Sequence, residues 1–392
     1  MPSINMSTYR ALQFSSPTTS GTIITKPTPS LPLPPGTALL KPLYAGVVSY
    51  TTHILQNGNP RKYNYPLPLV PGPSCIARVV AAPPDAPALT PGQLVLLDPT
   101  IRARDLQSDG AAFLLGYSGG PPGATPYTVM EAVWRDGTFA ERVQVPVENV
   151  HPLDEAALCG RLGYALTDLA ATLGTLAVSF GGLDAARVRP GETVVVAPAT
   201  GSFGGGAVHV ALALGARVVA MGRNETALAG LEALGDARVA AVRMSGSVEG
   251  DVVGITSALE RLGSRSLDVF FEISPPSVVN GPGQTVPYTT AALKVLRKGG
   301  RAVFMGGVKH DVSLPLREIV HGAKTLQGVW MYTPAQLTEL IRLVEAGVLR
   351  LGEDRGFACQ GVFPLERWEE AFETASREAS AGNFVLLQPN QE

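Results

Sequence analysis

Short apolar runs separated by glycine and proline fill the first 160 residues of the chain. Residues 38–48, 73–82 and 92–99 are examples. Apolar runs with this punctuation are typical of strands joined by irregular turns. The pattern predicts a strand-rich domain without a long helix in this part of the chain.

A regular alternation of strand-like and helix-like segments begins near residue 161. The strand-like runs are nearly continuous in apolar residues, as expected of parallel strands buried on both faces. They occupy residues 192–197, 216–221, 237–244, 267–274, 300–307 and 325–331. Helical segments such as 248–263 and 290–299 lie between them, which predicts an α/β fold with a doubly wound parallel sheet of about six strands. The chain then returns to a mixed pattern, with helices at 333–349 and 365–376 and a strand at 357–364.

The glycine-rich stretch APATGSFGGG, residues 197–206, joins the first of these strands to a helix. Such a turn holds the pyrophosphate of a dinucleotide when glycines allow the backbone to approach it. Pro198 stands where the fingerprint has its first glycine, but later glycines can still supply the approach. The alternative is an ordinary tight connection. The interpretation favoured by the strand, turn and helix order is a pyrophosphate site made by Thr200, Gly201, Ser202, Phe203 and Gly204.

The choice between NADH and NADPH is expected at the end of the next strand, about 20 residues further on. That strand ends in Gly222, Arg223 and Asn224, without a carboxylate. An arginine can hold a 2′-phosphate with paired charge-assisted hydrogen bonds. Arg223 and Asn224 therefore favour NADPH. The alternative is that Arg223 is a solvated surface residue and Glu225 binds the ribose.

Ligands of such sheets bind outside the carboxyl ends of the strands. This places further cofactor contacts after the strands at 267–274 and 300–307, although glycines there could instead only end a strand. The residues expected near the ribose and the nicotinamide are Ile273, Ser274, Met305, Gly306 and Gly307.

Composition narrows the class of protein. The 392 residues are more than one core usually supports, so two domains are expected. A formal net charge of -2 with 45% apolar residues gives no bias toward nucleic acid or anionic membrane. Three scattered cysteines fit neither a disulfide framework nor a tight metal cluster. We expect a cytoplasmic protein, since no signal-like start and no long apolar run is visible.

Several longer stretches carry a family resemblance. Residues 136–153, 188–225, 299–308 and 361–375 resemble, in this order, the medium-chain dehydrogenase/reductase superfamily, which includes zinc alcohol dehydrogenases, quinone oxidoreductases and enoyl reductases. The resemblance implies a GroES-like catalytic domain, a Rossmann domain and a cleft where they meet. The expected bounds are 1–160, completed by 334–392, for the catalytic domain and 161–333 for the Rossmann domain. The resemblance also suggests a homodimer that pairs through the edge strand at 325–331.

The zinc ligands of the metal-dependent relatives are missing from the matching positions. Val48 stands in place of the first ligand, and Pro73 and Ser74 stand in place of the next two. Valine and proline cannot donate to Zn²⁺, which needs thiolate, imidazole or carboxylate ligands. Cys159 is the candidate for a third ligand of the family, and the alternative is that it packs as a small apolar residue, as isolated cysteines more often do. Residues 103–138, which match the structural zinc lobe, contain no cysteine. No metal is expected.

A metal-free reductase needs another group to meet the negative charge that develops on the substrate oxygen. Tyr50 and His53 stand where the resemblance places the proton relay, so Tyr50 is the candidate acid and His53 its connection to solvent. Tyr63 and Tyr65 are weaker candidates, and each tyrosine could instead be a packing residue. Three functions follow: NADPH-dependent reduction of a conjugated enone, quinone or enal; reduction of a simple carbonyl, or alcohol oxidation, with Tyr50 in place of zinc; and NADPH binding without turnover. The first two functions imply a small-molecule substrate.

Overall fold

The structure, a computed structural model, describes residues 8–17, 20–56, 58–105, 111–278 and 281–391. The chain forms two compact units. Unit 1 contains residues up to Gly174 together with 359–379 and 384–392, and unit 2 contains 175–358 and 380–383. The boundaries of these units lie at 174 and 358, and domain bounds at 160 and 333 are expected from the sequence. Part of the segment 107–137 lies outside the described residues.

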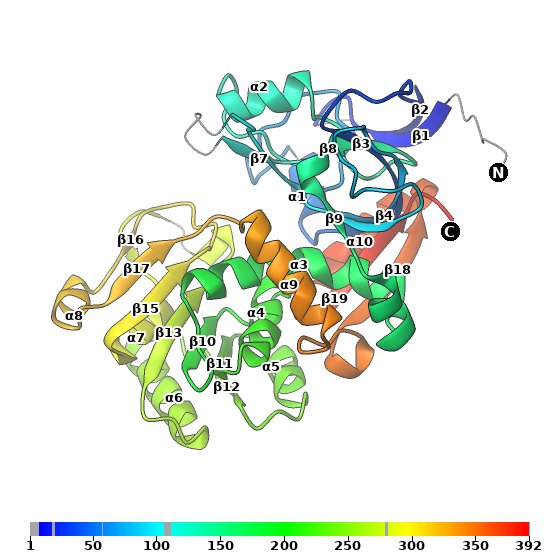
Figure 1. Ribbon diagram of the computed structural model, residues 1–392. Helices are drawn as coiled ribbons and strands as arrows, with labels where there is room; N and C mark the ends of the chain where they lie inside the picture. Colours follow the sequence, from blue (N-terminus) through cyan, green and yellow to red (C-terminus); the bar gives the residue numbers. More distant parts are fainter. Residues whose placement is uncertain (1–7, 18–19, 57, 106–110, 279–280, 392) are drawn as a thin grey trace. The chain divides into compact units, whose positions relative to one another are not determined.

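Unit 1 is built on a seven-stranded sheet with the order β18-β19-β3-β4-β5-β9, in which β8 also pairs with β3 (Figure 1). Its short strands, separated by turns, confirm the strand-rich prediction, and α2 is the longest helix described before residue 160. The strands are β1 (Thr8–Gln13), β2 (Thr22–Pro27), β3 (Thr37–Val47), β4 (Cys75–Ala81), β5 (Leu94–Leu97), β6 (Thr100–Arg102), β7 (Ala112–Leu114), β8 (Val143–Pro146), β9 (Val150–Pro152), β18 (Ala358–Pro364) and β19 (Asn383–Gln388). The helices are α1 (Thr51–Leu55), α2 (Thr125–Ala132) and α10 (Trp368–Arg377), with a π-helix at Ala156–Arg161 and 3₁₀ turns at Val147–Asn149 and Leu365–Arg367.

An aromatic cluster joins the two ends of the chain in the core of unit 1. The ring of Phe14 meets Trp368 edge-on, with centroids 5.4 Å apart. The ring of Phe372, one turn further along α10, packs against two more aromatic rings. Its centroid lies 5.2 Å from that of Trp368 and 5.9 Å from that of Phe139. Large aromatic side chains contribute much of the apolar area that a core buries. The C-terminal helix is therefore an integral part of this unit.

Unit 2 is built on a six-stranded sheet with the order β12-β11-β10-β13-β15-β17, in which all neighbours are parallel (green to orange in Figure 1). This is the doubly wound order, and it confirms the predicted fold class. The strands are β10 (Thr193–Ala197), β11 (Arg217–Gly222), β12 (Val239–Arg243), β13 (Leu267–Glu272), β15 (Leu296–Phe304) and β17 (Thr325–Gly328), with the short pair β14 (Gln284–Thr285) and β16 (Val312–Ser313) outside the sheet. β17 forms one edge of the sheet, and most of its residues are exposed.

Helices cover both faces of this sheet. Phe270 packs in one cluster with residues of α6 and α7, whereas Phe271, which points to the opposite face, lies against Gly182 of α3. On that second face, Gly206 of α4 also packs against α3. The helices are α3 (Leu166–Ala185), which belongs to unit 2 from residue 175 onward, α4 (Ser202–Ala213), α5 (Glu225–Glu232), α6 (Val248–Arg261), α7 (Pro287–Val295), α8 (Leu316–His321) and α9 (Pro334–Glu345), with 3₁₀ turns at Pro276–Val278 and Glu353–Arg355.

Helix α9 lies in unit 2 and contacts α3. Thr333 caps this helix, and the side chain of Gln336 completes a capping box with it. The amide of Gln336 also donates to the carboxylate of Asp184 at the end of α3, at 2.8 Å. These contacts place α9 in unit 2, although the sequence assigned it to the catalytic domain.

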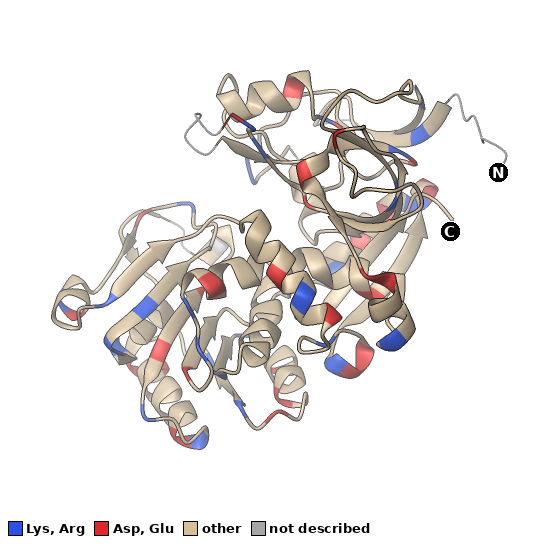
Figure 2. Ribbon diagram, viewed as in Figure 1, with Lys and Arg blue, Asp and Glu red and all other residues tan. Residues whose placement is uncertain are grey.

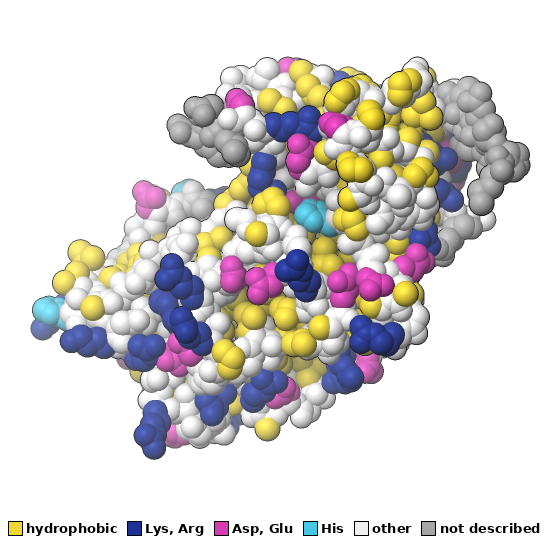
Figure 3. All heavy atoms as spheres, in the orientation of Figure 1, with side chains coloured by type: hydrophobic (Ala, Val, Ile, Leu, Met, Phe, Trp, Pro, Cys, Tyr) yellow, Lys and Arg dark blue, Asp and Glu magenta, His cyan; other side chains and the backbone are white. Residues whose placement is uncertain are grey.

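Helix α3 is the one described helix that is long and apolar enough to span a membrane. Its most apolar 18-residue window has a mean hydropathy of 1.3, and 61% of that window is buried inside the protein. A membrane span would expose most of its apolar surface to lipid, so α3 fits the core helix of a soluble protein. Figure 2 shows basic and acidic residues interspersed along the ribbon, and Figure 3 shows their side chains interspersed over the visible face, in keeping with the net charge of -2.

Candidate functional site

The glycine turn presents the N-terminus of α4 without a side-chain cap. Gly201 is the N-cap residue, with an extended backbone (φ -99°, ψ 170°). The first N–H groups of a helix have no partner within the helix, and the helix dipole makes this end attractive to anions. A pyrophosphate fits such a terminus. The residues present are therefore suited to a dinucleotide.

The glycines of the turn have different tasks. A Cβ at Gly204 would overlap the carbonyl oxygen of Pro198, and one at Gly205 would lie 2.6 Å from the Cβ of Ala381. At Gly206 it would lie 3.2 Å from the Oγ of Ser179 on α3. Gly201 has no atom within 4 Å of that position. The last three glycines thus serve packing inside the protein, and Gly201 borders open space where a ligand can approach.

This difference leads to a paired prediction. We expect Gly204→Ala to lower the free energy of unfolding by about 1–3 kcal/mol, because it overpacks the turn. Gly201→Ala should leave the midpoint of thermal unfolding nearly unchanged and weaken binding of a nicotinamide dinucleotide about tenfold or more, since a methyl group would occupy the approach to the phosphates. Thermal unfolding and fluorescence titrations with NADH and NADPH test both variants. Unchanged affinity of Gly201→Ala for both dinucleotides would contradict the pyrophosphate assignment.

The other residues of the turn are held by contacts within unit 2. The carbonyl oxygen of Thr200 accepts a hydrogen bond from the N–H of Ala381 at 3.0 Å. The hydroxyl of Ser202 donates to the carbonyl of Ser380 at 3.4 Å, and the carbonyl of Phe203 accepts from Ser179 at 2.8 Å. A segment close to the C-terminus, residues 380–383, thus supports the turn.

The end of β11 carries an arginine without a carboxylate partner among the described residues. Arg223 is exposed directly after the last residue of the strand. Asn224 accepts a hydrogen bond from the N–H of Ala227 at 3.1 Å and so caps α5. Glu225, the alternative ribose ligand, pairs with Arg243 at 3.0 Å.

Arg243 is a second arginine at this place, and sequence reasoning missed it. It is the last residue of β12 and lies opposite Gly222 of β11 in the parallel register. Two neighbouring strands therefore each place an arginine at the carboxyl edge of the sheet. The available signal was the arginine at the end of the run 237–244, but its position beside β11 depends on the strand register.

The loops after β13 and β15 lie side by side at the same edge. The N–H of Ile273 donates to Ala197 of β10 at 3.0 Å, and the N–H of Gly307 donates to the carbonyl of Ser274 at 3.0 Å. Ser274 is buried, and its hydroxyl accepts from the hydroxyl of Tyr288 at 2.9 Å. Met305 begins the second loop and packs against α3. The structure thus brings the five predicted residues of these loops together.

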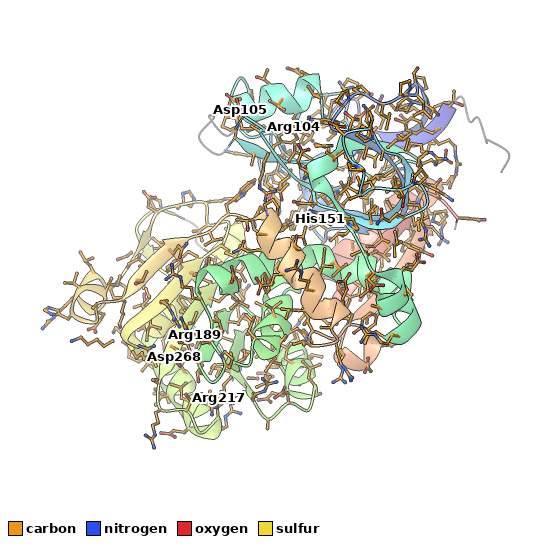
Figure 4. The ribbon with its side chains drawn as sticks, viewed as in Figure 1. Arg104, Asp105, His151, Arg189, Arg217 and Asp268 are labelled. Carbon is orange, nitrogen blue, oxygen red and sulfur yellow. The ribbon has the colours of Figure 1, made fainter. Side chains whose placement is uncertain are left out.

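At the opposite side of the sheet, where the strands begin, charged side chains form hydrogen bonds with one another and with the backbone. Asp268, at the start of β13, accepts from Arg297 at 2.6 Å and from the N–H of Thr193 at 2.8 Å. Arg217 donates to the carbonyl of Gly191 at 2.9 Å. Asp268 and Arg217 are labelled on this edge in Figure 4. Charges at this edge satisfy one another, whereas the carboxyl edge leaves Arg223 open to a ligand.

The candidate acid of unit 1 lies in a group of aromatic and cationic side chains. Tyr50 is the residue before α1, and its ring meets Tyr63 edge-on at 6.4 Å. The guanidinium carbon of Arg61 lies 3.8 Å from the centroid of the Tyr50 ring. Burial raises the pKa of Tyr50 well above its usual value of 10, Tyr63 raises it further, and the charge of Arg61 opposes the increase. Sequence reasoning missed Arg61, which lies in the loop after α1 and has no regular spacing from Tyr50.

The other candidates around Tyr50 have different surroundings. The hydroxyl of Tyr65 donates to the carbonyl of Ile54 at 2.8 Å, which gives it a structural role. His53 lies on α1 and is exposed, and among the described contacts of Tyr50 none is with His53. The neighbouring Thr51 is buried, donates to the carbonyl of Val48 at 2.7 Å and shares a hydrogen bond with Tyr117 at 2.5 Å.

The positions that match zinc ligands do not form a donor set for the metal. Val48 packs against the core of unit 1, and the hydroxyl of Ser74 donates to the carbonyl of Leu97 at 2.8 Å. Cys159 lies in the π-helix and is half-buried. Within the described residues, no three His, Cys, Asp or Glu side chains are grouped so that they could hold a metal ion. These residues do not fit a catalytic Zn²⁺.

Comparisons with known proteins agree with this architecture. Residues 34–155 match the family model of the alcohol dehydrogenase GroES-like domain, and residues 203–346 match that of zinc-binding dehydrogenases. L-Arabinitol 4-dehydrogenase from Talaromyces emersonii is 26% identical over 319 residues, which is 80% of this chain and 75% of that protein.

Solved structures share the fold at lower identity. A cobalt- and zinc-bound thermostable alcohol dehydrogenase from Pyrobaculum aerophilum aligns with a TM-score of 0.68 and 23% identity over 97% of this chain and all of that chain. A crotonyl-CoA carboxylase/reductase in complex with NADP aligns with a TM-score of 0.72 and 18% identity over 97% of this chain and 95% of that chain. The chain belongs to the medium-chain dehydrogenase/reductase superfamily. Its relatives support an NAD(P)-dependent oxidoreductase.

Proposed function

We propose that the protein is a zinc-independent, NADPH-dependent reductase of a conjugated enone, quinone or enal. The observation that carries this proposal is the donor set: Val48, Pro73 and Ser74 replace the ligands of the zinc-dependent relatives, while a neutral phenol, Tyr50, lies two residues beyond Val48. A bound NADPH would supply the hydride. The chain must then supply a binding site for the cofactor and a group that stabilises the negative charge developing on the substrate oxygen.

We assign the cofactor-binding site to the carboxyl ends of the parallel strands in unit 2. The first turn of α4, beginning after Gly201, would hold the pyrophosphate. Arg223 and Arg243 would hold the 2′-phosphate, because a guanidinium binds phosphate oxygens with two parallel hydrogen bonds. The pair of Arg243 with Glu225 supports NADPH over NADH, since this carboxylate is already engaged by an arginine.

Tyr50 is assigned the role of proton donor. Its raised pKa keeps the hydroxyl protonated at neutral pH, so it can donate a hydrogen bond to the oxygen where charge develops. Such a weak acid gives up its proton only to a strong base, for example an enolate. The cation of Arg61 over the ring would lower the free energy of the tyrosinate that remains. His53, on the exposed side of α1, would reprotonate Tyr50 through solvent.

Elemental analysis tests the metal-free proposal. We expect well under one zinc per chain in protein purified without chelator, and turnover unchanged after dialysis against a chelator, because the matching side chains cannot ligate Zn²⁺. One zinc per chain, with activity lost on chelation, would overturn this part of the proposal and leave the cofactor assignment standing.

A second candidate function is reduction of a simple carbonyl with Tyr50 as the electrophile. It is favoured by the same position of Tyr50 beside the metal-binding place of the alcohol dehydrogenases. Measuring NADPH oxidation with matched pairs of substrates separates the two: a saturated ketone that turns over while its conjugated analogue does not would support this second function. Tight NADPH binding without oxidation across both groups would support a binding protein without turnover.

We also propose a homodimer that pairs through the exposed edge strand β17. Exposed strand edges offer unpaired N–H and C=O groups that a second copy can use. Light scattering at several protein concentrations measures the mass directly, and a mass near 41.0 kDa at all of them would contradict the dimer.

A further inference from the structure

A buried carboxyl group lies at the carboxyl ends of the central strands of unit 2, where the nicotinamide cofactor is proposed to bind. Glu272 is the last residue of β13, between β10 and β15, and its side chain is 3% exposed. It forms no ion pair within the described part of the chain. Burying a carboxylate without a cation costs free energy, and such groups tend to occur at functional sites.

Both oxygens of this carboxyl group accept hydrogen bonds from the two cofactor loops. The N–H of Ser274 donates to Oε1 at 2.9 Å, and the N–H of Gly306 donates to Oε2 at 3.2 Å. A Cβ at Gly306 would lie 2.5 Å from Oε2, so the glycine permits this close approach. One side chain therefore joins the loop after β13 to the loop after β15.

The ionised form of Glu272 suits these two donors best. A carboxylate accepts at both oxygens, whereas a protonated carboxyl group carries a hydrogen on one of them and accepts there less well. Burial raises the pKa of Glu272 to about 7, although the bonds from Ser274 and Gly306 oppose the increase. The group therefore changes its charge near neutral pH.

The groups that face Glu272 do not titrate in the same range. Tyr288 on α7 has its pKa raised above the usual value of 10 by burial, and so stays neutral. Arg223, after β11, lies close enough for its charge to act on Tyr288 and lower the pKa of that phenol, against the effect of burial. The neighbours on the two adjoining strands, Ala197 of β10 and Phe304 of β15, are apolar.

We propose that the carboxylate of Glu272 is a positioning group that holds the loops after β13 and β15 in one arrangement, and that the affinity for the nicotinamide cofactor depends on its ionisation. The inference rests on the proposed cofactor site. If the ionised form holds the binding arrangement, cofactor affinity rises as the pH increases through the titration of Glu272. Direct repulsion between the carboxylate and the phosphates would have the opposite sign.

The test is a titration of NADPH binding against pH, followed by cofactor fluorescence. In the wild type we expect the Kd to fall about tenfold between pH 6 and pH 8 beyond any change seen in Glu272→Gln. The comparison with this variant is needed because the 2′-phosphate itself titrates near pH 6, at about the value of other phosphate monoesters. Asp268→Asn is the matched control, since it removes a carboxylate from the opposite end of the same strand, and it should keep the wild-type pH dependence.

A second measurement covers the case in which Glu272→Gln does not fold. Calorimetry of NADH binding to the wild type at pH 7, in two buffers of different ionisation enthalpy, should show release of about half a proton per site. NADH has no 2′-phosphate, so that group cannot supply the proton. Equal pH dependence in the wild type and Glu272→Gln, or no proton release, would overturn the inference alone. Failure of the wild type to bind either cofactor at any pH would instead overturn the proposed function.

Discussion

Replacing Tyr50 with phenylalanine is expected to lower turnover by about a hundredfold or more, the usual contribution of a positioned general acid. The ring would keep its contacts with Tyr63 and Arg61, because only the hydroxyl is lost. NADPH affinity should not change, since the cofactor residues lie in unit 2. Steady-state kinetics on a substrate found by screening, together with an NADPH titration, measures both effects.

The matched control is Tyr65→Phe. This variant also loses one tyrosine hydroxyl in unit 1, but that hydroxyl donates to the carbonyl of Ile54. We expect a loss of about 1 kcal/mol in the free energy of unfolding and turnover close to that of the wild type. If Tyr50→Phe kept full turnover, another donor or solvent would supply the proton.

Replacing Arg223 with alanine is expected to weaken NADPH binding about ten- to hundredfold and to leave NADH binding nearly unchanged. The expected size is that of hydrogen bonds to a charged partner, about 1.5–3 kcal/mol, where 1.4 kcal/mol corresponds to a factor of ten. The double variant Arg223→Ala, Arg243→Ala should lose more of the preference for NADPH than either single change. Titrations with both cofactors give the ratio of affinities directly.

Arg217→Ala is the control for a general effect of charge. Arg217 begins the strand that Arg223 follows, so it lies at the opposite end of β11 and only donates to a backbone carbonyl. Its removal should leave the ratio of NADPH to NADH affinity unchanged. An unchanged ratio in Arg223→Ala as well would rule out the assignment of the 2′-phosphate to this residue.

The elements that the sequence predicted well are those with a local signal. The six strands of unit 2 were visible as apolar runs, and their parallel arrangement followed from the helices between them. The glycine turn was visible from its composition, but the separate tasks of Gly201 and Gly204 were not. Those tasks depend on which atoms lie beside each glycine, namely Pro198 for one and open space for the other.

The residues that the sequence did not predict depend on contacts between distant positions. The role proposed for Arg243 depends on the strand register, which sets it opposite Gly222 of β11. Arg61 lies over Tyr50 because of the loop after α1, which has no periodic pattern. Glu272 stands at the end of an apolar run, and only the fold shows that two loops donate to it. The placement of α9 likewise depends on Gln336 reaching Asp184.

The support of the glycine turn by residues 380–383 limits how such chains can be recombined. Ala381 packs against Gly205, and its N–H donates to the carbonyl of Thr200. In the sequence, however, most of the cofactor-binding unit lies between the turn and Ala381. A chimera that takes only a continuous cofactor-binding segment from this protein would pair its glycine turn with a foreign C-terminal segment. Exchange between relatives therefore has to transfer two separate segments, so that the short segment 380–383 stays together with the turn that it supports.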